Sequence, residues 1–134
     1  MPGLHFEFVS PETVLFSGDV DQVDLPGIEG DLGVLPGHAP LVTLLRPGIV
    51  TIIRDGNREP VVVVAGFAEI GPGGLTVLAE RAGSREDFDL QALADDIKDA
   101  EEDVADCKDD AQRDKLARRL DQLRGLQAAL TQTQ

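Results

Sequence analysis

Histidines are the side chains of this chain that first suggest acid–base or nucleophilic chemistry. Only two occur: His5 lies on the polar side of an alternating segment, and His38 lies in a stretch rich in proline and glycine. No zinc-protease, nucleophile-elbow, P-loop or dinucleotide-binding motif stands in a suitable context. A Ser–His–Asp triad stays open, because all three residue types are present, but no local pattern favours one. The sequence therefore predicts no catalytic residues and no cofactor.

Carboxylates are abundant and could in principle hold a metal ion. Asp19, Asp21 and Asp24 alternate along an expected strand. A second group crowds an expected helix: Asp95, Asp96, Asp99, Glu102, Asp103 and Asp106. Their spacing does not match a calcium-binding EF-hand loop, so we interpret both groups as solvated faces and predict no metal site. The only cysteine, Cys107, excludes an internal disulfide and ends an apolar stripe, which favours a small buried side chain over a reactive thiol.

The composition excludes several classes of partner. With 12 Lys and Arg against 25 Asp and Glu, the net charge is −13, which argues against binding to nucleic acid or to anionic lipid. No apolar run approaches the ~18 residues of a membrane span, and the segment 1–10 lacks the features of a signal peptide. A length of 134 residues suits one domain with a small appendage.

The distribution of proline and glycine divides the chain into two parts. All 8 prolines lie in residues 1–87, whereas residues 88–134 hold no proline and only one of the 14 glycines, Gly125. Both residue types punctuate short strands and disfavour helices. We therefore expect a β-rich part at 1–87 and a helical part at 88–134.

The first part carries repeated strand and turn signals. Two Val/Ile-rich runs flank Asp55-Gly56, which is a strong hairpin signal, and Pro72-Gly73-Gly74 separates two further runs in the same manner. This spacing favours a β-sandwich or flattened barrel. The segment Val61–Val64 is apolar at every position, so we expect a strand that is covered on both faces.

The second part has helical periodicity. One apolar seam is formed by Leu90, Leu93, Ile97, Ala100, Val104 and Cys107, with Asp89 as its N-cap. After a polar break at 108–110, a second stripe is formed by Leu116, Leu120, Leu123, Leu126 and Leu130. These patterns predict an antiparallel two-helix hairpin. Opposite charge supports the pairing of the two helices. Residues 89–110 carry ten acids and two bases, a net charge of −8, and residues 111–134 carry two acids and five bases, a net charge of +3. An equally good interpretation is that both charged faces are simply solvated.

The segment 24–48 is unusual, because its five glycines and four prolines are threaded with Leu and Val. A flexible linker would be polar, so this segment predicts either a shaped contact surface or the tight corners of a small sandwich. Its central stretch, PGIEGDLGVLPGHAPL at 26–41, followed by Arg46-Pro47-Gly48, resembles the epsilon-subunit family of F-type ATP synthases, called delta in mitochondria. Further matches are LFSG at 15–18, VAGFAEI at 64–70 and TVLAE at 76–80. The resemblance spans residues 4–87; beyond them it covers only the hairpin architecture.

The resemblance implies a ten-stranded β-sandwich followed by two helices. It also implies a non-catalytic rotor subunit of the central stalk, which binds the gamma subunit and the c-ring and couples proton-driven rotation to the catalytic alpha/beta head. In the family, the loop matching Glu29, Gly30 and Asp31 faces polar loops of the c-ring. His38 matches a position near the gamma and ring interface; a hydrogen bond that stabilises its turn is the equal alternative.

The resemblance also gives the helical part a candidate regulatory role. In many members the hairpin extends into the catalytic head and blocks ATP hydrolysis, and in some an Ile/Leu-Asp-x-x-Arg-Ala motif binds ATP. Here Asp89 is kept but Ala92 replaces the arginine, so we expect no nucleotide binding. The second helix offers basic groups to the head: Arg113, Lys115, Arg118, Arg119 and Arg124. The acidic first helix would oppose that approach, so we expect weak or absent inhibition.

The rival interpretations are a free-standing β-sandwich regulatory or binding module, and a small hydrolase or isomerase that uses His38. For location, the resemblance and the lack of a transit peptide lead us to expect a peripheral protein on the cytoplasmic face of a bacterial inner (plasma) membrane.

Overall fold

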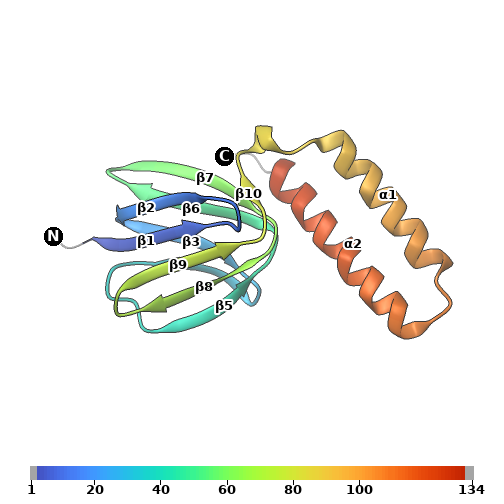
Figure 1. The fold of residues 1–134 in the computed structure, drawn as a ribbon, viewed down its shortest axis with the longest axis horizontal. Helices are drawn as coiled ribbons and strands as arrows, with labels where there is room; N and C mark the ends of the chain where they lie inside the picture. The colour runs from blue at the N-terminus through green and yellow to red at the C-terminus, as the bar shows by residue number, and fades with distance from the viewer. Residues whose placement is uncertain (1–2, 132–134) are drawn as a thin grey trace.

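Ten strands come first and two helices follow in the computed structural model, which describes residues 3–131 (Figure 1). The strands are β1 (Leu4–Val9), β2 (Val14–Val20), β3 (Gln22–Gly27), β4 (Gly30–Val34), β5 (Leu41–Leu45), β6 (Gly48–Arg54), β7 (Asn57–Val63), β8 (Gly66–Gly71), β9 (Gly74–Ala79) and β10 (Ala82–Gly83). A short 3-10 turn (Arg85–Asp87) leads to α1 (Leu90–Asp106) and α2 (Asp110–Thr131). The expected ten-stranded sandwich with a C-terminal helical hairpin is confirmed.

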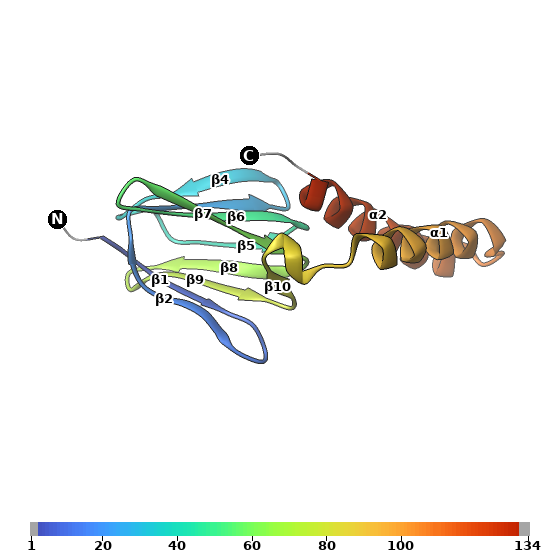
Figure 2. The same cartoon turned by 90° about the horizontal axis from the view of Figure 1, so that it is seen from above.

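The strands form one sheet that curls into two layers. Their order is β10-β7-β6-β3-β5-β8-β9-β1-β2, and β4 pairs with β3 outside this path. Figure 2 shows β4, β6 and β7 in one layer and β1, β2, β8 and β9 in the other. The pair β1–β9 is parallel, while the other strand pairs among residues 3–131 are antiparallel.

The hydrophobic core lies between the two layers. Phe6 and Phe8 of β1 are 0 % exposed, and their ring centroids lie 5.7 Å apart. Valines from the opposite layer, Val23 and Val50, are equally buried. The alternation of the strands therefore fills a continuous interior, which supports the sandwich without help from the helices.

The predicted hairpin at Asp55-Gly56 is confirmed. Arg54 pairs with Asn57, so the turn has two residues, and both carry positive φ (54° and 80°). Such a turn matches the right-handed twist of its strands, and Asp and Gly are the residues that tolerate it.

The prediction that Val61–Val64 is covered on both faces is also confirmed. Val63 is 0 % exposed and belongs to the sandwich core, whereas Val62 is 2 % exposed and packs into a second cluster with the helices. That second cluster also contains Phe88, Leu93, Ile97, Ala100, Leu120, Leu126 and Leu130. The strand β7 thus packs against the sandwich core on one face and against the helical hairpin on the other, where Ile49 of β6 lies beside it.

The helices begin as predicted but bury a slightly shorter seam. Asp89 caps α1, because its carboxylate accepts hydrogen bonds from the backbone N–H groups of Gln91 and Ala92, both at 3.0 Å. The predicted seam also includes Leu90, which is instead 50 % exposed, because the buried contacts of α1 begin at Leu93. Glu101 and Arg124 form an ion pair of 2.6 Å across the hairpin, as the opposite charges of the two segments favour.

Candidate partner-binding surface

The β3–β4 turn presents the first group of predicted contact residues. Gly27 pairs with Gly30, which leaves Ile28 and Glu29 as an exposed two-residue turn. Gly27 cannot be another residue without a shift, because a Cβ there would lie 2.6 Å from the carbonyl oxygen of Gly30. The two strands therefore approach closely and the turn projects sharply from the sandwich.

The turn is fastened to the corner between β5 and β6. The backbone N–H of Ile28 donates to the carbonyl of Leu44 at 2.8 Å, and that of Arg46 donates to Pro26 at 3.0 Å. The Arg46 guanidinium donates to the carbonyl of Gly27 at 2.5 Å and forms an ion pair with Asp31. Asp31 is thus paired within the chain, whereas the Glu29 side chain has no hydrogen-bond or ion-pair partner among residues 3–131.

His38 lies at the other end of β5. It precedes this strand in the β4–β5 loop, where its Nδ1 hydrogen-bonds the carbonyl of Ala39 at 2.7 Å. It borders a surface hollow of about 380 Å³ that is also lined by His5 and by the turn at 71–74. The structure therefore brings Glu29, Gly30 and Asp31 together but places His38 elsewhere.

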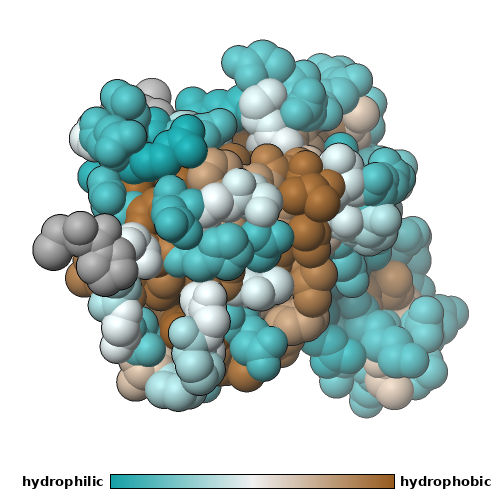
Figure 3. All heavy atoms as spheres, turned by 60° about the vertical axis from the view of Figure 1, so that its left-hand side comes forward, coloured by the Kyte–Doolittle hydropathy of each residue, from teal (hydrophilic) through white to brown (hydrophobic). Residues whose placement is uncertain are grey.

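An exposed apolar row was missed by the sequence reasoning. On the outer face of the neighbouring strands β5, β8 and β9, the side chains of Leu44, Phe67 and Leu78 lie side by side in register. Their exposed fractions are 59 %, 37 % and 39 %. The row continues through Val9 to Val14. We call these five residues the apolar stripe. Figure 3 looks obliquely across this face and shows hydrophobic side chains gathered beside the helical hairpin.

The apolar stripe runs next to the β3–β4 turn. A groove of about 500 Å³ is lined by Ile28 together with Leu44, Phe67 and Leu78, and by Gln122 of α2. Contiguous exposed apolar surface of this kind is typical of sites that bind another protein. Strand alternation gave a signal that could have found it, since Phe67 and Leu78 precede and follow core residues and must point outward.

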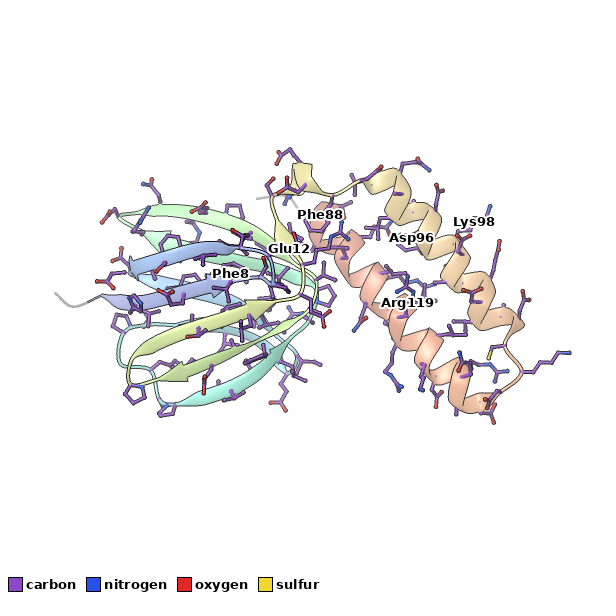
Figure 4. The ribbon with its side chains drawn as sticks, in the orientation of Figure 1. Phe8, Glu12, Phe88, Asp96, Lys98 and Arg119 are labelled. Carbon is purple, nitrogen blue, oxygen red and sulfur yellow. The ribbon has the colours of Figure 1, made fainter. Side chains whose placement is uncertain are left out.

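The segment matched to the ATP motif borders a smaller pocket. This pocket, of about 330 Å³, lies between the hairpin and the sandwich and is lined by Asp89, Ala92, Asp96 and Arg119 among others. Asp96 on α1 and Arg119 on α2 lie on facing sides of the two helices (Figure 4). The Asp89 carboxylate is engaged in the helix cap, and Ala92 adds a methyl group where a phosphate would need a donor.

The five basic residues of α2 that are predicted to contact the catalytic head differ in whether they already form an ion pair within the chain. Arg113 pairs with Asp110 and also donates to the carbonyl of Cys107 at 2.5 Å, and Arg124 pairs with Glu101. The remaining three, Lys115, Arg118 and Arg119, form no ion pair within residues 3–131.

Among residues 3–131, the structure holds neither a helix suited to span a membrane nor a cluster of metal ligands. Neither α1 nor α2 combines the length and the apolar character that crossing a bilayer requires. Over residues 3–131, no cluster of three or more His, Cys, Asp or Glu side chains is arranged to hold a metal ion.

Comparison with known proteins places this geometry in a family. Residues 3–85 match the model of the ATP synthase delta/epsilon chain β-sandwich domain. The ATP synthase epsilon chain of Maricaulis maris is 49 % identical over 125 residues, which is 93 % of this chain and 94 % of that protein. Epsilon chain 1 of Nitrobacter hamburgensis is 47 % identical over 133 residues, covering 99 % and 98 % of the two chains.

Solved structures of ATP synthases contain chains with the same fold as this one. A chain of the Euglena gracilis mitochondrial ATP synthase, solved as an OSCP/F1/c-ring assembly, superposes with a TM-score of 0.79 at 25 % identity, over 97 % of this chain and 82 % of that one. A chain from the central stalk and c-ring of the Tetrahymena thermophila enzyme shares the fold, with a TM-score of 0.63 at 13 % identity, over 95 % and 96 %. The resemblance read from residues 26–48 is thereby confirmed: this chain belongs to the delta/epsilon family of ATP synthase subunits.

Proposed function

We propose that this chain is a non-catalytic central-stalk subunit of a proton-translocating F-type ATP synthase. It couples rotation of the c-ring to the catalytic alpha/beta head through the gamma subunit. The relatives are named as epsilon chains, and the Euglena neighbour comes from an assembly of F1 with the c-ring. The observation that carries the proposal is the apolar stripe, which lies on a stiff sandwich next to a fastened, charged turn.

The sandwich suits torque transfer because it resists shear. Its two layers belong to one hydrogen-bonded sheet, and the residues between them are close to fully buried. Packed interiors have low compressibility and transmit strain. A force applied at the β3–β4 turn is therefore passed to the opposite layer with little deformation.

The two contact surfaces have different chemistry and different partners. The apolar stripe binds gamma, since burying exposed aliphatic and aromatic surface supplies affinity. The β3–β4 turn contacts the polar loops of the c-ring, where the free Glu29 carboxylate sets the register more than the affinity. His38 stays a predicted contact at the far end of β5, and its hydrogen bond to Ala39 supports the turn-stabilising alternative.

Co-purification tests the assignment of the stripe. Phe67→Asp places a charge at the centre of the stripe, and we expect the tagged chain to lose gamma and the catalytic head while remaining folded. Leu90→Asp is the matched control, because Leu90 is also half exposed but lies on α1, away from the stripe. Normal recovery of gamma with Phe67→Asp would contradict the assignment. Recovery of an unrelated soluble partner by the unaltered chain would favour the free-standing module.

The helical part, residues 88–134, acts at most weakly as an inhibitor and binds no nucleotide. Two of its five candidate head contacts, Arg113 and Arg124, are paired inside the hairpin, and Ala92 supplies no donor for a phosphate. The test compares ATP hydrolysis by the assembled enzyme with and without residues 88–134. We expect similar rates, and strong activation on truncation would overturn this part of the proposal.

The chain is held at a membrane only through the complex. In a bacterium, this places it on the cytoplasmic face of the inner (plasma) membrane as a peripheral protein. Washing membranes under conditions that strip F1 should release it together with gamma. Release without gamma would argue against a shared stalk.

A further inference from the structure

Arg46 connects the two stems of the β3–β4 turn. Its Nη1 donates to the carbonyl of Gly27, immediately before the turn, and its Nη2 contacts the carboxylate of Asp31, just after it. The guanidinium fork is planar and has donors at fixed spacing, so one side chain can hold two acceptors in a defined relation. The side chain therefore spans the base of the turn whose tip carries Glu29.

The sheet alone does not fix this turn. The strand β4 pairs with β3, and β4 is not part of the main path of the sheet, so hydrogen bonds support it along one side. Short contacts from the β5–β6 corner supply the second support: the backbone bonds of Ile28 and Arg46, and the Arg46 side chain. Of these, the side-chain contacts are the ones that a substitution can remove without altering the backbone bonds.

Arg46 also determines the charge of the turn. Glu29 and Asp31 are two residues apart, and without a cation nearby the turn would present two carboxylates. The ion pair with Arg46 compensates Asp31, whereas Glu29 keeps no partner among residues 3–131. A single uncompensated carboxylate at a fixed position is a more specific feature for a partner to recognise than a diffuse negative loop.

We propose that Arg46 is a positioning residue for the contact with the c-ring: it braces the β3–β4 turn and neutralises Asp31, so that Glu29 alone is presented. This rests on the proposed function of the turn. Arg46 does not itself touch the ring in this scheme; it acts through Glu29. Its neighbour Pro47 lies close to α2, since a Cβ added at Gly125 would be 3.5 Å from the Pro47 side chain.

The test is a double-mutant cycle in the complete enzyme. Arg46→Met, Glu29→Gln and the double variant are assembled into ATP synthase in inverted membrane vesicles, and proton pumping is measured per ATP hydrolysed. We expect each single variant to lower this ratio by about twofold or more and the double variant to fall no further, because both substitutions remove the same contact. Arg58→Met is the matched control, since Arg58 of β7 forms an exposed ion pair with Asp24, which lies on β3 but does not contact the turn at 28–29.

A second readout reports the brace directly. In the full-length chain, Arg46→Met should raise hydrogen exchange at the Ile28 amide by about tenfold, because the turn then opens more often. Arg46→Lys keeps a charge for Asp31 but cannot make the forked contact, so it should raise exchange by a smaller factor. Arg58→Met should leave the Ile28 amide unchanged.

The possible outcomes distinguish the proposed role of the β3–β4 turn from the proposed role of Arg46. An unchanged pumping ratio with Glu29→Gln overturns the proposed role of the turn itself. A lowered ratio with Glu29→Gln, combined with an unchanged ratio for Arg46→Met or with fully additive losses in the double variant, leaves that role standing and overturns the positioning role of Arg46. Unchanged exchange at Ile28 in Arg46→Met also overturns the brace.

Discussion

Replacing Leu126 by aspartate should detach the helical hairpin and leave the sandwich folded. Leu126 is 3 % exposed and belongs to the cluster in which Val62 and Phe88 meet the helices. The sandwich has a separate core, formed by residues such as Phe6 and Val50. A charge placed in the second cluster therefore acts on the docked helices and not on the strands.

The magnitude follows from burial. Removing a buried leucine costs about 1.5–3 kcal/mol, and burying a carboxylate without a partner adds about 2 kcal/mol or more. A total of about 4 kcal/mol raises the undocked population by about a thousandfold. The docking floor on the sandwich consists mainly of Val62 with the partly buried Ile49 and Val64, which is a small area, so this loss is enough to open the hairpin.

Hydrogen exchange followed by mass spectrometry measures this separation. Peptides from α1 and α2 should lose protection, whereas peptides from β1 to β9 should keep it. Ala111→Asp is the control, because it adds the same charge to α2 at an exposed position in its first turn. Unaltered protection of both helices would refute the reasoning, and so would simultaneous loss of protection in the strands, because the two clusters would then not be independent.

Two further substitutions and one ligand titration have defined outcomes. Gly27→Ala should lower the free energy of unfolding by about 1–3 kcal/mol, because the added Cβ would meet the carbonyl of Gly30. Gly71→Ala is the control, because no atom lies within 4 Å of a Cβ added there, and it should lower the free energy of unfolding by less than half as much. Denaturant titrations followed by circular dichroism measure both. Asp89→Ala should cost about 0.5–2 kcal/mol by removing the cap of α1, seen as faster exchange in its first turn; an unchanged rate would mean that the cap contributes nothing. Calorimetric titration with Mg-ATP should show no binding to the unaltered chain, and saturable heat would contradict the interpretation of Ala92.

Much of the architecture could be predicted because it depends on neighbours in the sequence. The Asp55-Gly56 turn, the cap at Asp89 and the two-faced burial of Val61–Val64 follow from local conformational preference and from the period of the apolar residues. The family could be identified from residues 26–48, because their glycines and prolines fix a specific series of turns.

The candidate site could be predicted less completely from the sequence, and the reason is physical. Which of Glu29 and Asp31 stays free depends on Arg46, which is brought to the turn by the curl of the sheet and not by proximity in the sequence. The apolar stripe likewise needs three strands in register, β5, β8 and β9, before Leu44, Phe67 and Leu78 become neighbours. Composition and periodicity by themselves predicted a β-rich part, either a sandwich or a flattened barrel, followed by a helical hairpin, and the family resemblance pointed to the sandwich. The tertiary structure alone decided which side chains share a surface and which charges are already compensated, because both depend on contacts between residues that are distant along the chain.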